Sequence, residues 1–457
     1  MTMIRTGLAA LALSVASPPL LGQSALPPDS VIHAILRDRV AADDAVGIVV
    51  GLLDERGRRF VSRGLSKKEG KPLDSRTVFE IGSITKVFTG LALADMAGRG
   101  EVRLDDPVGR HLPPTVRVPT RGGREITLAD LATHSSGLPR LPSNMAPSSP
   151  ANPYADYTEQ QLYDFLGGHE LRRDIGAQYE YSNLGVGLLG HVLARVARTS
   201  YEDLVVRRIA GPLKMPDTRI TLSPSMRSRA ASGHDANGDS TSMWDLPTLA
   251  GAGGLRSTAE DMLSFLGAQL DPPAPLADAI RLTHARRFEA PQQRLGIGLG
   301  WHIIKPGDAD IIWHNGGTGG FHSFVGFSPS RRVAVVVLTN STRNIDDIGF
   351  HLLDARMPLQ KPPAARTEVA LDSTVLDRYV GEYELAPTFR IAVTREGNAL
   401  FGQATGQPRF RLFAESETKF FLKVVDAQIT FERQPDGRVT GLILHQNGGN
   451  VPGKKMR

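Results

Sequence analysis

The segment Phe79-Glu80-Ile81-Gly82-Ser83-Ile84-Thr85-Lys86 places a hydroxyl and an amine three positions apart, where a helix is expected to begin. Apolar residues recur at helical spacing behind it, up to Gly98-Arg99-Gly100, so we predict a short strand, a turn and then a helix. Positions i and i+3 share one face of a helix, so the Lys86 amine can reach the Ser83 hydroxyl. In apolar surroundings a lysine has a lowered pKa and can take the proton of a serine nucleophile.

Ser-x-x-Lys is a weak signal when it stands alone. It occurs again at Ser416-Glu417-Thr418-Lys419, in a segment that alternates like a surface strand, and we expect no chemistry there. The alternative interpretation of Ser83 is a helix N-cap with a solvated lysine behind it. Two later segments favour chemistry instead: Tyr181-Ser182-Asn183, and His314-Asn315-Gly316-Gly317 at the end of an apolar run.

These three segments, in this order, resemble the Ser-x-x-Lys, Tyr-x-Asn and Lys-Thr-Gly elements of the serine β-lactamase and penicillin-binding-protein superfamily. The similarity is greatest to class C β-lactamases and related DD-peptidases. Two further segments support the resemblance, Ile126 to Pro139 and Gly253 to Met262, and it covers roughly residues 30 to 350.

The resemblance implies a role for each site residue. Ser83 would attack a carbonyl and form an acyl-enzyme, and Lys86 would take its proton. Tyr181 would relay a proton to the leaving group, and a phenol does this only if nearby cations lower its pKa. Asn183 would hold Lys86 and a substrate carbonyl, and the backbone amides of Ser83 and Gly317 would form the oxyanion hole.

The third element departs from the family pattern. His314-Asn315-Gly316 stands where the family most often has Lys-Thr-Gly, and it is similar to the His-Thr-Gly of some DD-peptidases and to several esterase-like relatives. A lysine is a permanent cation, whereas an unperturbed histidine is only partly charged at neutral pH. We therefore expect His314, with Asn315 and Gly316, to bind a substrate carboxylate weakly or in a pH-dependent way.

Several residues also have structural interpretations. Tyr181 could be an ordinary half-buried aromatic residue and His314 a histidine at a strand end, although the three motifs together favour the site. We interpret His134, which precedes a Gly-Leu-Pro turn, as structural, and Trp301 and Trp313 as core residues.

Other function classes are disfavoured. Gly185 to Gly190 matches G-x-G-x-x-G but continues as an amphipathic helix, so we expect helix packing there and no nucleotide cofactor. His169-Glu170 lacks the second histidine of a zinc-protease helix, and the chain has no cysteine, so no metal site is expected. There is no G-x-S-x-G elbow, which disfavours an α/β-hydrolase. The net charge of +5 is small and dispersed, which argues against a nucleic-acid partner.

The N-terminus predicts export. Arg5 precedes an apolar run from Gly7 to Val15, and Pro18-Pro19 and small residues follow, as in a secretory signal too short to span a bilayer. Residues 1–22 are taken as this signal, although the cleavage point stays open. The protein is expected to be periplasmic or secreted, without an integral membrane segment and without lipidation, because it has no cysteine.

The pattern of elements predicts an α+β fold in residues 23–356. Strands at both ends of this region with helices between them suggest an antiparallel sheet flanked by helices, plus a helical lobe. The expected elements are a helix near residues 30–40, strands near 46–53 and 59–64, a mostly helical middle, strands near 298–304, 311–314, 321–327 and 333–339, and a helix near 345–353. The site segments should meet in a cleft between sheet and lobe. The Pro- and Ser-rich loop from Leu141 to Pro153 is a candidate rim for substrate selection.

Residues 357–374 read as a linker, and residues 375–457 as a small antiparallel β-barrel. Seven short alternating strands follow one another there at even spacing with turns between them. The run is similar to the lipocalin-like domains that follow some β-lactamase-related hydrolases.

Together these features predict an exported serine hydrolase that acts through an acyl-enzyme on a β-lactam or D-alanyl peptide. An esterase or other amidase on the same scaffold, and a penicillin-binding protein that acylates without turnover, stay open as alternatives. The substrate is a small molecule or peptide, and the oligomeric state does not follow from the sequence.

Overall fold

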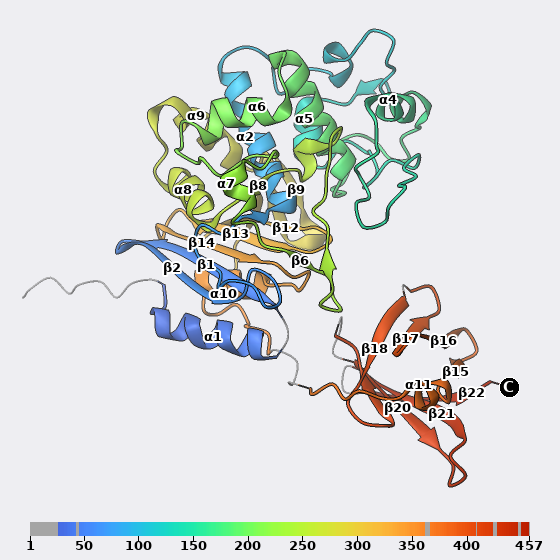
Figure 1. Cartoon of the computed structure of the whole chain (residues 1–457). Helices are drawn as coiled ribbons and strands as arrows, with labels where there is room; N and C mark the ends of the chain where they lie inside the picture. Colours follow the sequence, from blue (N-terminus) through green and yellow to red (C-terminus); the bar gives the residue numbers. More distant parts are fainter. Residues whose placement is uncertain are drawn as a thin grey trace, which may run out of the picture.

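The computed structural model describes residues 26–42, 45–361, 366–407, 409–423, 427–446 and 449–456. Figure 1 shows a sheet with helices packed on it, followed by a separate group of strands near the C-terminus. The predicted signal, residues 1–22, lies outside the described residues.

The sheet has eight strands in the order β2-β1-β14-β13-β12-β11-β10-β9, and every neighbouring pair is antiparallel. The strands are β1 (Gly47–Asp54), β2 (Gly57–Gly64), β9 (Phe288–Ala290), β10 (Leu295–Ile297), β11 (His302–Ile304), β12 (Ile311–Gly317), β13 (His322–Ser328) and β14 (Val333–Thr339). The N-terminal hairpin therefore pairs with the last strand of the domain, which confirms the predicted antiparallel sheet.

One predicted strand was too long. Residues 298–304 were expected to form a single strand, but β11 begins only at His302. The residues before it form a turn closed by the Gly298 amide and the Trp301 carbonyl at 2.9 Å, with Gly300 at φ +78°. The short strands β9 and β10, near the edge of the sheet, were not predicted.

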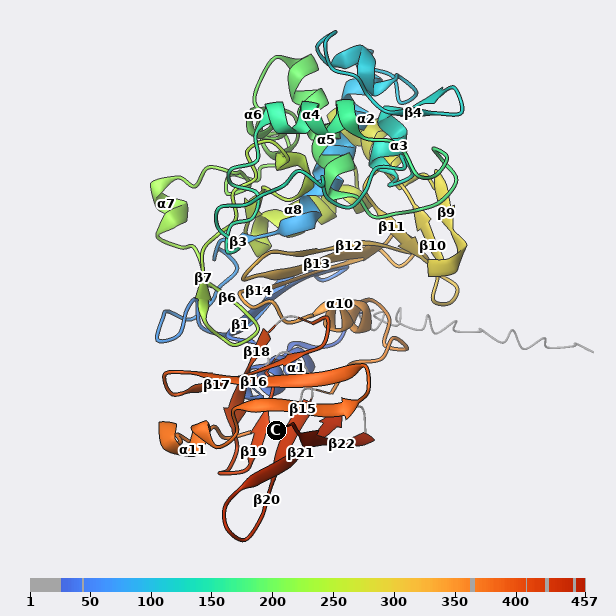
Figure 2. The ribbon, with the colours of Figure 1, turned by 90° about the vertical axis from the view of Figure 1, so that its right-hand side faces the viewer.

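Both faces of the sheet are covered, as Figure 2 shows. Along β14 the side chains alternate between two cores: Val336 and Leu338 belong to the core under the helical lobe, and Val335 and Val337 to the core under α1 (Asp29–Ala41) and α10 (Asp346–Leu353). A strand buried on both faces reads as a continuous apolar run, which is the sequence of β14.

The helical lobe is built around α2 (Thr85–Gly98), in which residues 85–96 are all buried. The lobe and the loops around it also contain α3 (Leu128–Ala132), α4 (Glu159–Gly168), α5 (Asn183–Ala197), α6 (Tyr201–Val205), α7 (Pro224–Arg227), α8 (Ala259–Leu270) and α9 (Ala277–His284). Short two-residue pairings join β3 (Phe79–Glu80) to β8 (Arg256–Ser257), β4 (Thr120–Arg121) to β5 (Arg124–Glu125), and β6 (Gly233–His234) to β7 (Ser240–Thr241).

The glycines of α5 serve helix packing, as the sequence predicted. A Cβ atom on Gly187 would lie 2.7 Å from the Leu249 side chain, and one on Gly190 would lie 2.8 Å from the Gly251 Cα. Only glycine therefore lets α5 approach the 3₁₀ turn η4 (Ala250–Ala252) this closely.

The C-terminal region is a closed barrel of eight antiparallel strands. They are β15 (Gly381–Ala386), β16 (Phe389–Glu396), β17 (Ala399–Ala404), β18 (Arg409–Ala414), β19 (Lys419–Phe421), β20 (Ala427–Arg433), β21 (Val439–Gln446) and β22 (Gly449–Lys455). The predicted barrel is confirmed, and β22 adds an eighth strand to the seven expected. The short helix α11 (Ser373–Asp377), which was not predicted, precedes the barrel.

Candidate active site

The nucleophile segment folds as a 3₁₀ turn, η1 (Gly82–Ile84), which leads directly into α2. The end of β12 lies against this turn: a Cβ atom on Gly316 would be 2.1 Å from the Ile81 carbonyl oxygen and 2.9 Å from the Ser83 amide nitrogen. The Ser323 hydroxyl on β13 also donates a hydrogen bond to that carbonyl at 2.9 Å. Glycine at position 316 is therefore what permits strand and turn to meet.

Lys86 is fully buried, and its Nζ lies 2.9 Å from the Ser83 Oγ. Its second partner is the Ala252 carbonyl in η4, at 2.6 Å. Its chain neighbours Ile84, Val87 and Phe88 are fully buried as well. Burial, and then the positive charge of Arg140, lowers the pKa of Lys86 well below its usual value. A neutral amine next to a serine hydroxyl is suited to accept its proton.

Tyr181 lies beside this pair, with the Lys86 Nζ 4.9 Å from its ring centroid. His134 stacks on the phenol ring at 4.6 Å, and its Nδ1 accepts a hydrogen bond from the Ser182 amide at 3.0 Å. The structural role expected for His134 is thus to position Tyr181. The condition of a lowered tyrosine pKa is not met: burial raises the pKa of Tyr181 to about 12, and hydrogen bonding with Ser83 and the charge of Arg140 offset this only in part. The phenol therefore stays protonated, and Lys86 is the better base.

Asn183 begins α5 and lines the cleft, but its expected contact with Lys86 is replaced by another. Its Nδ2 donates to the Tyr154 hydroxyl at 3.0 Å, and the lysine uses the Ala252 carbonyl instead. The Asn183 Oδ1 is buried and has no hydrogen-bond partner among the described residues. This oxygen is available to accept a hydrogen bond from a bound molecule.

His314 does not lie where a substrate-binding cation should. It is fully buried because it shares with Gly316 the face of β12 that packs on the nucleophile turn. Its Nδ1 contacts the Asn315 carbonyl at 2.6 Å, and its ring stacks on His302 with 4.7 Å between centroids. Burial, and then the proximity of His302 and Lys86, lowers the pKa of His314 well below its usual value. The expected partly charged carboxylate ligand is therefore a buried neutral imidazole.

The rest of the third motif does reach the cleft. Asn315, Gly316 and Gly317 line it together with Ser83. The Asn315 Nδ2 donates to the Asp346 carboxylate of α10 at 2.6 Å, and the same carboxylate contacts His322 at 2.9 Å. Asn315 is therefore held in a fixed orientation at the end of β12.

The cleft has a volume of about 580 Å³. Leu141, Met145 and Pro153 line it, so the loop expected to form a rim does so. Sequence reasoning missed four lining residues: Arg140, Tyr154, Trp244 and His302. Arg140 directly follows the segment from Ile126 to Pro139, but nothing in that segment indicates where a long side chain will point.

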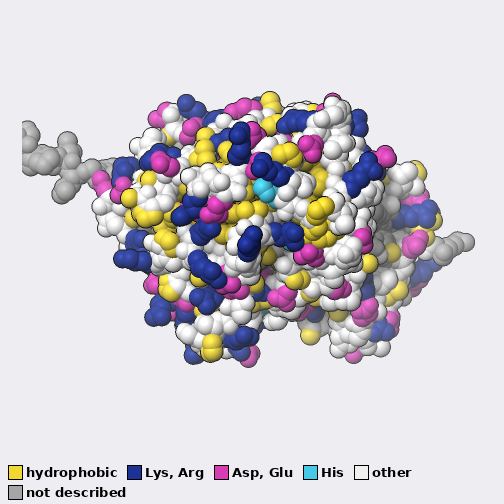
Figure 3. Space-filling model, turned by 90° about the horizontal axis from the view of Figure 1, so that it is seen from above, with side chains coloured by type: hydrophobic (Ala, Val, Ile, Leu, Met, Phe, Trp, Pro, Cys, Tyr) yellow, Lys and Arg dark blue, Asp and Glu magenta, His cyan; other side chains and the backbone are white. Residues whose placement is uncertain are grey.

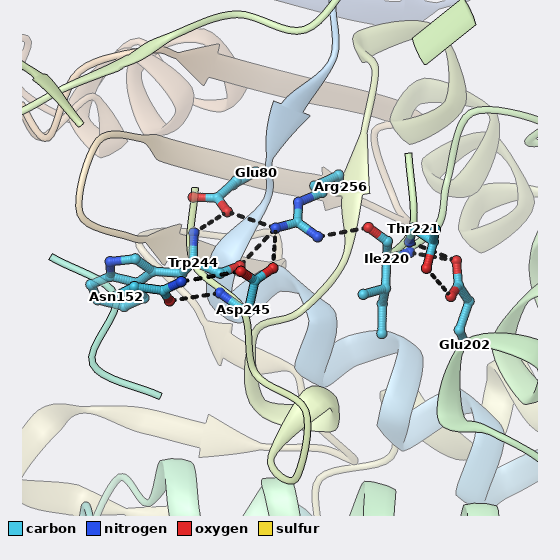
Figure 4. Close-up of polar contacts among 8 residues, drawn as sticks. All are labelled: Glu80, Asn152, Glu202, Ile220, Thr221, Trp244, Asp245 and Arg256. Atoms are coloured by element: carbon cyan, nitrogen blue, oxygen red, sulfur yellow. Dashed lines mark hydrogen bonds and ion pairs between the residues drawn. The ribbon is translucent and has the colours of Figure 1, made fainter. Parts of the chain in front are cut away.

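Figure 4 shows how the rim is held. Asn152 and Asp245 exchange two hydrogen bonds, at 2.8 and 3.1 Å, which tie the rim loop to the segment that carries Trp244. Arg256 donates to the Trp244 carbonyl at 2.7 Å, and the Glu80 carboxylate accepts from the Trp244 amide at 2.7 Å. Burial raises the pKa of Glu80 to about 7. The strand before the nucleophile therefore anchors the pocket wall.

The other terminal nitrogen of the Arg256 guanidinium, Nη1, donates to the Ile220 carbonyl at 2.6 Å. The adjoining backbone amides of Ile220 and Thr221 both donate to the Glu202 carboxylate of α6, at 3.0 and 2.8 Å. The support of the rim thus extends into the helical lobe.

The remaining motif residues lie away from the cleft. Ser416 is exposed in a barrel turn and accepts a hydrogen bond from the Lys419 amide at 3.2 Å. His169 stacks on Phe165 in α4. Trp301 is buried and stacks on Phe265, and Trp313 packs on Phe350, as expected for core residues.

Within the described parts of the chain, no cluster of three or more His, Cys, Asp or Glu side chains has a metal-binding arrangement. Likewise, none of the described helices has the length and apolar character needed to cross a bilayer. On the face shown in Figure 3, Lys and Arg side chains are scattered among acidic and apolar ones and form no continuous stripe.

We expect the buried histidines to make the protein sensitive to acid. Burial, and then the charge of Lys86, lowers the pKa of His302 to about 4. The unfolded chain, with a histidine pKa near 6.5, binds more protons between these values. The contribution of neutral His302 to the free energy of unfolding is therefore fully present above about pH 6.5 and is lost as the pH falls toward 4. Thermal unfolding at pH 7 and pH 5 should show a smaller difference in His302→Gln than in the wild type.

The matched control for this experiment is His33→Gln, because His33 is exposed on α1. It should retain the wild-type difference between the two pH values. Equal pH dependence in the His302 and His33 variants would show that His302 is not buried in its neutral form.

Comparisons with known proteins agree with this geometry. A family model described as Beta-lactamase matches residues 32–352, and one described as a domain of unknown function, DUF3471, matches residues 365–452. The D-alanyl-D-alanine-carboxypeptidase/endopeptidase AmpH of Escherichia coli K12 is 32% identical over 340 residues, which cover 70% of this chain and 86% of AmpH. The Beta-lactamase of the same strain is 26% identical over 376 residues, with coverages of 74% and 95%.

A solved structure shows the same fold. The crystal structure of a class C β-lactamase from Rhodobacter sphaeroides matches with a TM-score of 0.62 and 26% identity, and the match covers 71% of this chain and 98% of that one. The predicted combination of antiparallel sheet and helical lobe is therefore confirmed.

Proposed function

The chain belongs to the β-lactamase family, and from that premise we propose that it is an exported serine hydrolase that acts through an acyl-enzyme on β-lactams or D-alanyl peptides. The observation that carries the proposal is the 2.9 Å contact between Ser83 Oγ and the Nζ of a fully buried Lys86, at the wall of a 580 Å³ cleft. A buried amine with a lowered pKa has a clear use beside a nucleophile.

The proposed reaction begins with proton transfer. Lys86 Nζ takes the proton of Ser83 Oγ, and the oxygen attacks the substrate carbonyl carbon. The Ala252 carbonyl accepts one Lys86 hydrogen bond at 2.6 Å and so orients the amine toward the serine. The negative charge on the carbonyl oxygen is then stabilised by the backbone amides of Ser83 and Gly317, both of which line the cleft.

Collapse of the tetrahedral intermediate breaks the bond to the leaving group, which needs a proton. The neutral phenol of Tyr181 supplies it and recovers a proton from the Lys86 ammonium, 4.9 Å from the ring centroid. Water then attacks the acyl carbonyl carbon and gives a proton through Tyr181 to Lys86. The bond to Ser83 Oγ breaks, and Lys86 returns the proton to that oxygen. The unpaired Asn183 Oδ1 is placed to accept a hydrogen bond from an amide N–H of the substrate.

The substrate class follows from the charge of the cleft. Arg140 is the only Lys or Arg among the described residues that line it, and His314 cannot supply a positive charge. The Arg140 carbonyl accepts hydrogen bonds from the Asn183 and Leu184 amides at 3.0 and 3.2 Å, which fix its backbone at the start of α5. Its guanidinium carbon lies 5.0 Å from the Tyr181 ring centroid. We assign carboxylate recognition to Arg140, and an anionic substrate to the cleft.

Arg140→Gln should therefore raise KM for a substrate with a free carboxylate by roughly 10- to 100-fold, the range for a lost charge-assisted hydrogen bond. The change in kcat should be much smaller. Steady-state kinetics with nitrocefin and with a D-Ala-D-Ala peptide measure both constants.

Two comparisons control this result. Arg117→Gln removes an exposed arginine outside the cleft lining and should leave the kinetics unchanged. KM for p-nitrophenyl butyrate, which has no carboxylate, should not depend on Arg140. An Arg140 variant with wild-type KM for nitrocefin would remove this residue from substrate recognition.

An esterase is the second candidate function, and the neutral His314 favours it because the third motif then supplies no cation. A screen of the wild type and Ser83→Ala against nitrocefin, a D-Ala-D-Ala peptide and p-nitrophenyl butyrate separates the two. If the protein hydrolyses only the ester, and this activity depends on Ser83, the protein is an esterase and not a hydrolase of β-lactams or D-alanyl peptides. A penicillin-binding protein without turnover would show an acyl adduct that persists in intact mass spectra.

Export of the chain is supported by its N-terminal sequence, with Arg5, the apolar run from Gly7 to Val15 and the small residues after it. We place the mature protein in the periplasm or outside the cell. N-terminal sequencing of protein recovered from a periplasmic extract tests this, because export by a cleaved signal predicts a start near residue 23.

A further inference from the structure

The C-terminal barrel is filled at one end and hollow at the other. Aromatic rings pack the filled end: Tyr379 and Phe431 stack with 4.3 Å between centroids, and Phe420 lies 5.4 Å from each of them. Elsewhere in the interior lies a cavity of about 350 Å³. Eight-stranded barrels can be filled by side chains or can hold one small ligand, and this barrel does both.

The hollow end results from small side chains at inward-facing positions. Gly402 and Ala404 on β17 and Ala427 on β20 line the cavity. Gly402 has an ordinary φ and is not forced by crowding, because a Cβ atom there would make only normal contacts of 3.5 Å with Leu412. A larger residue could therefore be accommodated at this position, and the space is a property of the sequence rather than of backbone strain.

The lining determines what the cavity can hold. Ile391, Leu412 and Ile429 form apolar walls, and no Lys, Arg, Asp or Glu is among the described lining residues. Among the described residues, the only polar side chains that line it are the exposed amides of Gln407 and Gln446. A charged ligand would lose its hydration without gaining a partner, whereas an apolar ligand gains from leaving water.

The volume of the cavity limits the size of the ligand that it can hold. An engineered apolar cavity of about 150 Å³ holds one benzene molecule, so a cavity somewhat more than twice as large holds two or three fused or linked rings or a short hydrocarbon chain. We propose that the C-terminal barrel binds an uncharged, mainly apolar small molecule of this size, with any hydrogen-bonding group directed to the two glutamine amides. This site is separate from the cleft around Ser83, and the proposal does not depend on the reaction proposed there.

The test is a fluorescence titration of the full chain with N-phenyl-1-naphthylamine, a neutral three-ring probe that brightens in apolar surroundings. We expect saturable binding of one probe per chain. Ala404→Phe, which fills the cavity, should weaken binding by more than about tenfold. The matched control is Gln403→Phe, which adds the same side chain one residue away, where it points out of the barrel. It should bind like the wild type.

Two further measurements complete the test. Gly402→Leu fills the cavity from another position and replaces Ala404→Phe if that variant loses the barrel signal in circular dichroism. The sulfonated probe 8-anilinonaphthalene-1-sulfonate, which carries a charge, should bind the barrel more weakly than the neutral one. The proposal would be overturned if the wild type did not bind the neutral probe, or if both cavity-filling variants bound it as tightly as the wild type does.

Discussion

Replacing Ser83 by Ala is expected to abolish acylation and to lower kcat by roughly a million-fold, the size of loss seen when a serine nucleophile is removed from a hydrolase. The reason is chemical rather than structural, because the variant lacks the Ser83 hydroxyl, which lies 2.9 Å from the Lys86 Nζ. Labelling by a fluorescent penicillin and turnover of nitrocefin measure the two effects. Intact mass spectrometry should show no adduct.

The second Ser-x-x-Lys segment provides a matched control. Ser416→Ala changes the same residue type in the same local motif, but Ser416 is exposed and its hydroxyl accepts a hydrogen bond from a backbone amide in the barrel. Labelling should be unchanged in this variant. Labelling that persists in Ser83→Ala would exclude Ser83 as the nucleophile, and its loss in Ser416→Ala would move the chemistry to the barrel.

Lys86→Met should lower kcat/KM by roughly 10²- to 10⁴-fold, the usual contribution of a general base. Methionine has a similar length and fills the buried site, so the loss reports the amine and not a cavity. Lys86→Arg should be equally inactive, because a guanidinium stays protonated in proteins. Activity in the arginine variant would show that the enzyme needs a positive charge at this position rather than a base.

The same methionine variant should be more stable than the wild type at neutral pH. Burial holds the pKa of Lys86 well below the value it has in the unfolded chain, so the unfolded state binds more protons. The stability of the wild type is then reduced at pH 7 and rises as the pH rises toward the unfolded lysine pKa. Methionine has no proton to lose, so its advantage in thermal unfolding should shrink between pH 7 and pH 9.

The control for the stability measurement is Lys419→Met, because Lys419 is the exposed lysine of the second motif. Its unfolding temperature should follow that of the wild type at both pH values. A Lys86→Met protein that is less stable than the wild type at pH 7 would mean that the lysine is bound in its charged form and is paired.

The family, the nucleophile and the barrel could be predicted from the sequence because each depends on spacing along the chain. Ser83 and Lys86 are three residues apart at a helix start, and that spacing alone brings their side chains together. The barrel strands alternate with period two, so their inner faces are visible in the sequence. Even so, the final strand β22 was missed.

The electrostatics of the site could not be predicted, because burial depends on which distant segments pack together. His314 was expected to be a partial cation, yet contact between β12 and the nucleophile turn covers it completely. The proton relay through Tyr181 required a lowered pKa, yet burial raises the pKa of Tyr181 to about 12. Desolvation is the largest cause in both cases: it outweighs the charge of Arg140 at Tyr181, and it acts in the same direction as His302 and Lys86 at His314.

The sequence by itself determined the order of the motifs, the local geometry of Ser83 and Lys86 and the division into a hydrolase-type region and a barrel, since these depend on neighbours within a few residues. Tertiary structure alone decided that the Ala252 carbonyl, 166 positions from Lys86, orients the amine, and that Arg140 is the cation of the cleft. Hydrogen bonds and burial between distant segments exist only after the chain has packed, and they determine which groups carry charge.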